Sequence, residues 1–210
     1  EITTRLVGSE MCIRDSDMAV AVNDMALMES LTVSYLEAAL PDINRADACV
    51  VEANLSETCI AYLAERLRVP VVADPVSGVK ATRLHPLFER LDALKPNRDE
   101  ALLLTGEATC EAAARALLKK GVKRVILSMG ADGAYYADAT GAGTIIPAER
   151  FTCQTTGAGD AFFSAVVESL ARGMRLDDAV TCGARLASMT VSTSESTCPH
   201  VDEHFFGIGE

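Results

Sequence analysis

Short apolar runs alternate with segments of helical spacing along this chain, and this alternation restricts its fold more than any other feature of the sequence. Residues 69–73 and 123–128 are short and rich in valine, isoleucine and leucine, as in strands that are covered on both faces. Ser56 stands where the cap of one intervening helix is needed, and either Asn97 or Asp99 can cap another. The pattern predicts one α/β domain, a parallel sheet layered between helices. With 210 residues, 49% of them hydrophobic, the chain can bury such a core.

Turn and cap residues set the boundaries of the expected elements. Proline is expected to end the first helix at Pro41, and glycine to end another at Gly121. Strands are expected at 18–22, 48–52, 69–73, 92–95, 123–128 and 151–154, with a hairpin of 134–136 and 144–146 across a Gly-rich loop at 141–143. Helices are expected at 31–40, 56–68, 84–91, 100–104, 111–120, 161–172 and 176–190.

The two ends of the chain lack these patterns. Residues 1–16 show neither a strand period nor a helix period, and we expect a non-native or disordered leader there. Residues 17–200 are expected to form the folded domain and residues 201–210 a tail with little regular structure. Since residues 18–22 have the pattern of a core strand, we expect further strands of the same sheet upstream in an intact protein.

Composition excludes several classes of function. With 30 acidic and 19 basic side chains, the net charge of −11 argues against nucleic acid or an anionic membrane as a partner. Seven cysteines without CxxC spacing favour free thiols in a reducing compartment, and we expect a cytoplasmic protein. No apolar run approaches the roughly 20 residues that span a bilayer. The three histidines are too dispersed to predict a zinc site.

A Gly-rich turn precedes the long apolar helix expected from residue 161. Residues 155–160 read Thr-Thr-Gly-Ala-Gly-Asp. Small residues at the start of a helix let a ligand approach free backbone N–H groups, and such a turn attracts phosphate. Asp160 in the first helical turn could accept a proton from an attacking hydroxyl. The turn therefore suggests phosphoryl transfer, with a purely structural helix start as the alternative.

Two further motifs follow expected strands. Asn97 and Glu100 open a helix, and residues 128–133, Ser-Met-Gly-Ala-Asp-Gly, form a turn with two glycines. Ligands of open α/β sheets bind beyond the carboxyl ends of the strands, where both motifs and the 155–160 turn could meet. Taken singly, the first is also compatible with an ordinary helix start and the second with an ordinary turn.

Together these motifs resemble those of the ribokinase (PfkB-type) sugar and nucleoside kinases over about residues 17–199. Residues 155–162 look like the C-terminal family signature, Asn97-x-x-Glu100 like the magnesium motif and residues 128–133 like the ATP loop. By that resemblance Asp160 is the catalytic base, and the N–H groups of residues 157–159 form the hole for the transferred phosphoryl group. The resemblance further implies ATP and Mg²⁺ as cofactors. The implied assignments are Gly157, Ala158 and Gly159 in the anion hole, Glu100 at Mg²⁺ through water, Asn97 at the nucleotide or that shell, and Thr156, Ser128, Gly130 and Gly133 along the nucleotide groove.

Within the family, the sequence most resembles the pseudouridine kinases. Residues 21–25, 52–55 and 74–80 look like segments of that subgroup. Asn23 and Asp24 could reach a nucleoside or merely close a strand. Asp74 and Lys80 could touch phosphates or hold their loop by a salt bridge, and we favour a structural role for Lys80.

Two departures from the family pattern affect the prediction. Gln154 replaces an aspartate that helps many relatives to bind a monovalent cation, which puts activation by K⁺ in doubt. The N-terminal region that carries the Gly-Gly substrate signature and much of the lid of the family is absent from the sequence. We expect an ATP-dependent kinase whose partner is a small nucleoside or sugar, with pseudouridine preferred, and the sequence leaves a homodimer open. The alternatives are a ribokinase- or adenosine-kinase-like enzyme and a non-catalytic nucleotide-binding fragment.

Overall fold

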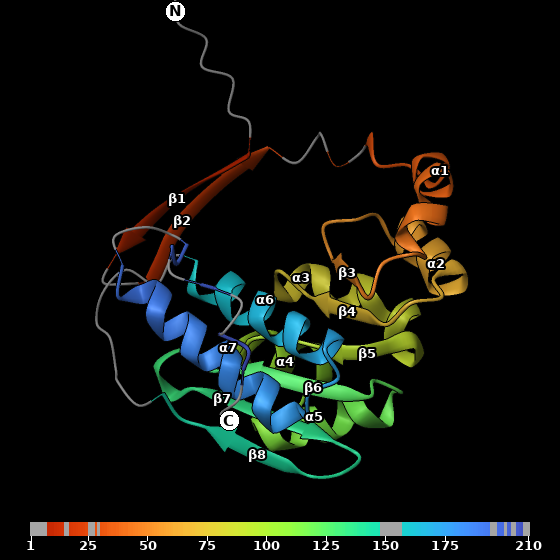
Figure 1. Cartoon of the computed structure of the whole chain (residues 1–210). Coiled ribbons are helices and arrows are strands. Elements are labelled where there is room, and N and C mark those ends of the chain that lie inside the picture. The colour runs from red at the N-terminus through yellow and green to blue at the C-terminus, as the bar shows by residue number, and fades with distance from the viewer. Residues whose placement is uncertain are drawn as a thin grey trace, which may run out of the picture.

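A six-stranded sheet forms the centre of the computed structural model, which describes residues 8–14, 17–24, 28, 30–147, 157–193, 197–199, 201–202 and 205–207. The strands lie in the order β3-β4-β5-β6-β7-β8. The first four are parallel to one another, and β7 and β8 continue the sheet as an antiparallel hairpin. The bounds are β3 Cys49–Glu52, β4 Val71–Asp74, β5 Leu91–Leu94, β6 Arg124–Ser128, β7 Ala134–Asp138 and β8 Ala142–Ile145. The predicted α/β layering around a mostly parallel sheet is confirmed (Figure 1).

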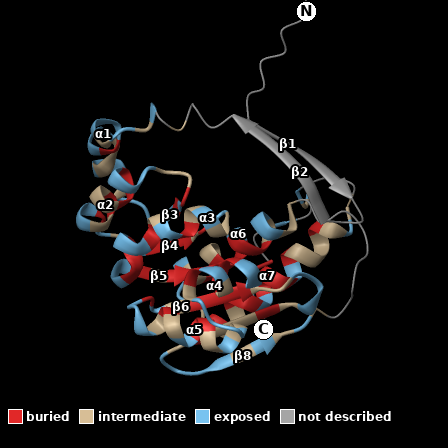
Figure 2. Cartoon of the chain, turned by 180° about the vertical axis from the view of Figure 1, so that it is seen from behind, coloured by how far each residue is buried: buried red, intermediate tan, exposed pale blue. Residues whose placement is uncertain are grey.

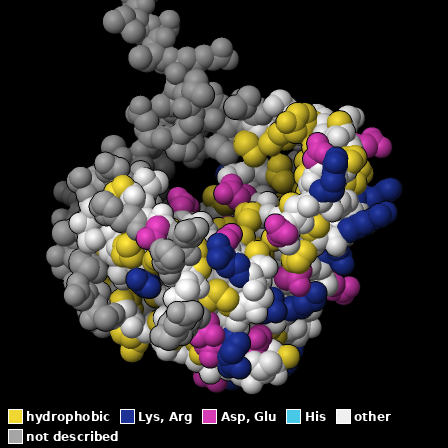
Figure 3. All heavy atoms as spheres, viewed as in Figure 1, with side chains coloured by type: hydrophobic (Ala, Val, Ile, Leu, Met, Phe, Trp, Pro, Cys, Tyr) yellow, Lys and Arg dark blue, Asp and Glu magenta, His cyan; other side chains and the backbone are white. Residues whose placement is uncertain are grey.

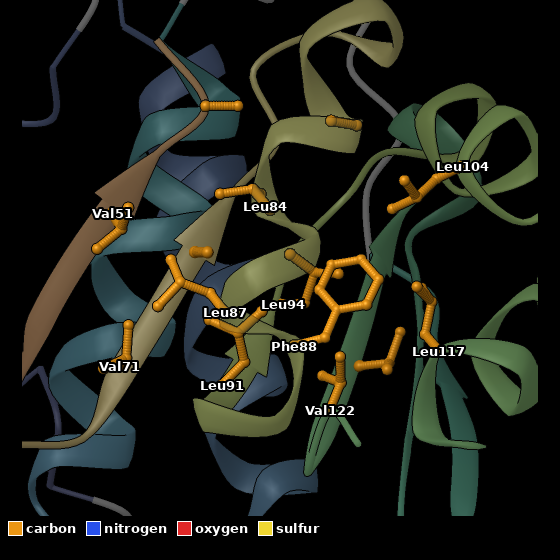
Figure 4. Close-up of a cluster of buried hydrophobic side chains, with 14 of the residues drawn as sticks. Val51, Val71, Leu84, Leu87, Phe88, Leu91, Leu94, Leu104, Leu117 and Val122 are labelled. Carbon is orange, nitrogen blue, oxygen red and sulfur yellow. The ribbon is translucent and has the colours of Figure 1, made fainter. Parts of the chain in front are cut away.

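Helices cover both faces of this sheet. Their bounds are α1 Val33–Ile43, α2 Glu57–Arg66, α3 Gly78–Ala81, α4 Arg98–Thr105, α5 Cys110–Lys119, α6 Ala158–Ala171 and α7 Leu176–Val191, with 3₁₀ turns η2 Thr82–Arg90 and η3 Gly130–Asp132. Alternate strand residues face opposite layers: Val71 packs in the cluster with α2, η2, α4 and α5, whereas Val72 packs against α6 and α7. Figure 2 shows the central strands buried, and Figure 4 shows the larger cluster.

Two helices differ from their predicted form. Helix α1 continues past Pro41 to Ile43, because a proline in the last turn removes only its own N–H donor and the amide of Asn44 still bonds to Leu40. The segment expected as a helix at 84–91 is the 3₁₀ stretch η2, with Pro86 in its interior. Its buried residues Leu84, Leu87 and Phe88 join the larger core cluster, so tertiary packing sets its form.

Two turns also lie elsewhere than predicted. Ala142 and Gly143 belong to strand β8, so the loop of the hairpin is centred on residues 139–141 rather than 141–143. The Asp138 carboxylate closes this loop by accepting hydrogen bonds from the amides of Thr140 and Gly141, at 2.7 and 3.2 Å. Helix α6 begins at Ala158, three residues before the predicted start. The expected strand at 151–154 lies outside the described residues.

A separate two-stranded sheet lies near the N-terminus. Strands β1 (Gly8–Arg14) and β2 (Asp17–Asp24) are antiparallel, with Gly8 opposite Asp24 (Figure 1). Strand β2 confirms that residues 18–22 form a strand, but it pairs with β1 and not with the six-stranded sheet, where a core strand was expected. Strand β1 lies where no regular structure was expected, because pairing with β2 supplies what local periodicity lacks. Whether the leader is native stays a prediction. At the other end, Phe205 of the expected tail is 5% exposed and packs beside Cys182 and Leu186 of α7.

Candidate active site at the carboxyl ends of the strands

The motif at Asn97 and the loop after β6 meet at one edge of the sheet. Strands β5 and β6 are parallel, so their carboxyl ends lie together. An isolated parallel bridge joins Asn97 to Ser128, and the amide of Ser128 donates to the carbonyl of Pro96 at 3.1 Å. The structure thus brings together the predicted magnesium motif and the predicted ATP loop.

A reciprocal capping box holds Asn97 and Glu100 at the start of α4. The Glu100 amide donates to Oδ1 of Asn97 at 2.8 Å, and the Asn97 amide donates to Oε2 of Glu100 at 2.9 Å. Glu100 is only 7% exposed. The capping box therefore fixes the position of a buried carboxylate just after the carboxyl end of strand β5.

The environment of Glu100 suits a hard cation. Burial raises the pKa of its carboxyl group, and the Asn97 hydrogen bond and Lys95 oppose this shift while Asp74 and Asp99 add to it. Among the described residues nothing donates a hydrogen bond to Oε1 of Glu100. One carboxylate oxygen with water is a suitable donor set for Mg²⁺, which keeps several waters and binds phosphates. The described residues contain no group of three or more typical metal ligands, so phosphate oxygens and water would complete the shell.

The predicted ATP loop is a tight turn around η3. The amide of Met129 donates to the carbonyl of Gly133 at 2.7 Å, and Gly133 has a φ of 91°. A side chain on Gly133 would collide with the backbone of Ile145, so glycine is required there by the hairpin as well as by the turn. Arg98 of α4 and Asp132 of η3 form an ion pair at 3.0 Å, which links the loop to the magnesium motif.

The start of α6 presents the predicted catalytic residues. Gly157 occupies the N-cap position with a left-handed φ of 85°, followed by Ala158, Gly159 and Asp160 in the first turn. The carbonyl of Gly157 accepts the amide of Ala161 at 2.9 Å, so the amides of residues 158–160 precede the regular helical bonding. Asp160 is exposed. Thr156, predicted to line the nucleotide groove, and Gln154 lie outside the described residues.

Sequence reasoning missed the role of Lys95. Its ammonium group lies 2.8 Å from Oδ2 of Asp74, and both side chains are almost buried. The same ammonium lies 5.5 Å from the centre of the Phe163 ring on α6. Asp74 therefore pairs with Lys95, whereas Lys80 bonds Oδ1 of Asn54 at 2.8 Å, in keeping with the structural role favoured for it. A lysine directly after an apolar strand was the available signal, but its partners are distant in sequence.

Asn23 and Asp24, the predicted nucleoside contacts, lie at the end of β2 in the separate hairpin. Their side chains lie outside what the structure describes, so the predicted nucleoside contacts stay predictions. A hollow of about 340 Å³, lined by Arg124, Asp138 and Arg175 among others, lies at the opposite end of the sheet, because Arg124 begins β6 and Asp138 ends β7. The candidate site lies at the other end of the sheet, beyond the carboxyl ends of the parallel strands β5 and β6.

Comparison with known proteins identifies the family of this chain. A profile described as pfkB family carbohydrate kinase matches residues 8–202. The chain belongs to the PfkB family of carbohydrate kinases. Its similarity to solved family members extends to the fold: a putative sugar kinase from Clostridium perfringens matches with a TM-score of 0.75 and 26% identity, over 88% of this chain and 60% of that one.

Individual PfkB relatives differ in the substrates that their names state. Pseudouridine kinase of Escherichia coli K12 is 33% identical over 190 residues, which are 87% of this chain and 61% of the relative. Ribokinase of Haemophilus influenzae is 29% identical over 88% of this chain and 55% of the relative. The Arabidopsis thaliana ribokinase structure, complexed with ribose and ATP, matches with a TM-score of 0.64 and 25% identity over 78% of this chain and 55% of that one. The chain thus spans about three fifths of the length of such relatives.

Proposed function

We propose that this PfkB-family chain carries the phosphoryl-transfer half of a kinase that moves the γ-phosphoryl group of ATP to a hydroxyl of a ribosyl nucleoside or sugar. The observation that carries the proposal is the start of α6, where exposed Asp160 stands beside the backbone amides of Gly157, Ala158 and Gly159, the predicted anion hole. A base and an anion-binding turn side by side are what this reaction requires, because phosphoryl transfer depends mainly on positioning and on charge stabilisation.

In the proposed reaction, the Asp160 carboxylate accepts the hydroxyl proton as the substrate oxygen bonds to the γ-phosphorus. The bond from that phosphorus to the bridging oxygen breaks, and ADP leaves with its electron pair. The amides at the start of α6 donate to the oxygens of the transferred group, where the helix N-terminus also supplies partial positive charge. Glu100 would hold Mg²⁺ through water, and Asn97, Ser128 and Gly130 would line the nucleotide side. Bound Mg²⁺ would supply charge neutralisation for the phosphates.

For the acceptor we propose pseudouridine, converted to pseudouridine 5′-phosphate. Support comes from the 33% identity to a pseudouridine kinase and from the segments at 21–25 and 74–80. The proposed location is cytoplasmic, which suits the free thiols of Cys49, Cys59, Cys110, Cys182 and Cys198. No described helix has the length and apolar character needed to cross a membrane.

Replacement of Asp160 tests the proposed chemistry. Asp160→Asn is expected to lower kcat by about 10²- to 10⁴-fold, the usual contribution of a general base, while calorimetry still detects Mg-ATP binding. Asp178→Asn is the matched control, because Asp178 occupies the same position in the first turn of α7 and loses the same charge. Normal turnover of Asp160→Asn would contradict the proposal.

An acceptor panel tests the substrate. ADP release is measured with pseudouridine, uridine, adenosine and ribose, and the highest kcat/KM is expected for pseudouridine. A preference for ribose or adenosine would replace the proposed substrate but not the reaction. Mg-ATP binding without turnover on any acceptor would instead support a non-catalytic nucleotide-binding role for this chain.

A further inference from the structure

Lys95 is a buried charge that the proposed reaction does not use. The Lys95 side chain is 8% exposed and that of its partner Asp74 is 16% exposed. The pair of Lys123 with Asp92, at the other end of β5, has the same 2.8 Å separation but exposures of 61% and 20%. Burial of two charges costs about as much free energy as their attraction returns, so stability alone is a weak reason for this arrangement.

On one side, Lys95 controls a strained turn through Asp74. While Oδ2 of Asp74 receives the ammonium group, Oδ1 accepts the amide of Val76 at 2.9 Å. Val76 has a φ of 63°, a conformation that is costly for a β-branched residue. The amide of Ser77 bonds to the carbonyl of Pro75 at 2.7 Å and completes the turn that leads into α3. We infer that the ion pair of Lys95 with Asp74 holds Val76 in its left-handed conformation.

On the other side, Lys95 contacts the helix that carries the proposed base. Phe163 lies in α6, three residues after Asp160 and therefore one turn further along the helix. Its ring is 9% exposed, and the ammonium group lies 5.5 Å from its centre, within range of a cation–π interaction. A single side chain therefore touches both the turn after β4 and the start of α6.

We propose that Lys95 is a positioning residue that ties the turn of residues 74–77 to helix α6 and so holds the two sides of the phosphoryl-transfer site in place. The expected effect of Lys95 on kcat rests on the proposed function. Its expected effect on the 74–77 turn and on α6 does not. Without the ammonium group, Asp74 loses its ion pair and Val76 can return to a negative φ. Helix α6 loses the cation–π contact at Phe163.

Hydrogen exchange tests the structural content without any need for activity. Lys95→Met keeps most of the side-chain volume against Phe163 but removes the charge. Amide exchange is expected to rise by roughly tenfold in both 74–81 and 158–166, as local opening becomes easier. Lys123→Met is the matched control, since it removes the other ion pair of β5 and should affect the opposite end of the sheet. A rise at 74–81 with none in α6 would overturn the proposal.

Kinetics test the consequence for the reaction. Lys95→Met is expected to lower kcat on the order of 10- to 100-fold, with less than about twofold change in the acceptor KM, because misplacement of reacting groups affects the chemical step first. Lys95→Arg, which keeps the charge and can stack on the ring, should recover most of the loss. An unchanged kcat in a folded Lys95→Met variant would overturn the proposal. If the unmodified chain shows no turnover, the proposed function fails, and the exchange experiment alone decides the role of Lys95.

Discussion

At the scale of single residues, the candidate site contains a buried acidic group whose ionisation does not favour the folded state. This group is Glu100. Its carboxylate is buried in the capping box of α4, and burial raises its pKa. A raised pKa in the folded state means that ionisation of Glu100 lowers the stability of the fold as the pH rises through that pKa.

Glu100→Gln is therefore expected to raise the melting temperature near neutral pH, because it removes the charge whose burial is unfavourable. Glutamine can still accept the Asn97 amide and keep the box. The gain should vanish as the pH falls below the unfolded value of about 4.3, where glutamate is neutral in both states. Thermal unfolding across pH measures it, with exposed Glu111→Gln as the control. A less stable Glu100→Gln at pH 7 would show that the site favours the charge.

Gly157 is a second residue whose conformation matters, because its φ of 85° is unfavourable for a side chain. Gly157→Ala is expected to cost about 1–2 kcal/mol in the free energy of unfolding by denaturant. Gly159→Ala adds the same methyl group two residues later, where φ is not left-handed and the space is open, so it should cost far less. Equal effects of the two changes would contradict a role for the left-handed turn.

At the scale of elements, the close approach of α6 and α7 sets the position of α6, the helix that carries Asp160. A Cβ atom at Gly183 of α7 would lie 2.9 Å from Cγ2 of Val166 and 3.0 Å from the Phe162 ring. The absence of a side chain at Gly183 lets the two helices touch. Helix α6 thus receives its orientation from α7 on one side and from Lys95 on the other.

Gly183→Val is expected to overpack this contact and to lower the free energy of unfolding by about 1–3 kcal/mol. Chemical denaturation measures the loss. Thr181→Val places valine at an exposed position of the same helix and controls for helix propensity. A loss for Gly183→Val no greater than that for Thr181→Val would show that α6 can shift to accommodate the side chain.

At the scale of the whole molecule, strand β3 forms an edge of the six-stranded sheet in the described part of the chain. Val50 in this strand is 47% exposed. An open strand edge with an apolar side chain favours pairing with another chain. Over the described surface seen in Figure 3, by contrast, acidic and basic side chains are interspersed.

Val50→Lys is expected to reduce concentration-dependent association of the chain, since a charge on an edge strand opposes strand pairing. Sedimentation velocity over a range of protein concentrations measures the change. Tyr35→Lys adds the same charge at a side chain that is 59% exposed on helix α1 and not on the edge strand, and it controls for the added charge. Association that is unaffected by Val50→Lys would place any self-contact elsewhere.

Features that depend on near neighbours in the chain could be predicted from the amino-acid sequence. Apolar periodicity predicted the strands of the parallel sheet and most helices. Ser56 is the predicted cap of α2, and of the two candidates Asn97 and Asp99 it is Asn97 that caps α4, because a cap bonds to amides within its own turn. The positions of the motifs after strands likewise predicted that the Asn97 motif, the 128–133 loop and the 155–160 turn could meet, since parallel strands end on the same side of a sheet. The structure places Asn97 beside Ser128.

Contacts between segments that are distant in sequence could not be predicted in this way, because they depend on how the elements pack. The pairing of Lys95 with Asp74 rather than of Asp74 with Lys80, the ring of Phe163 beside it and the left-handed Val76 depend on how strands and helices are placed. The 3₁₀ form of η2 and the pairing of β1 with β2 have the same origin. A local pattern shows which face of an element is apolar. Which distant charged groups pair depends on packing, because burial changes the free energy of each pairing.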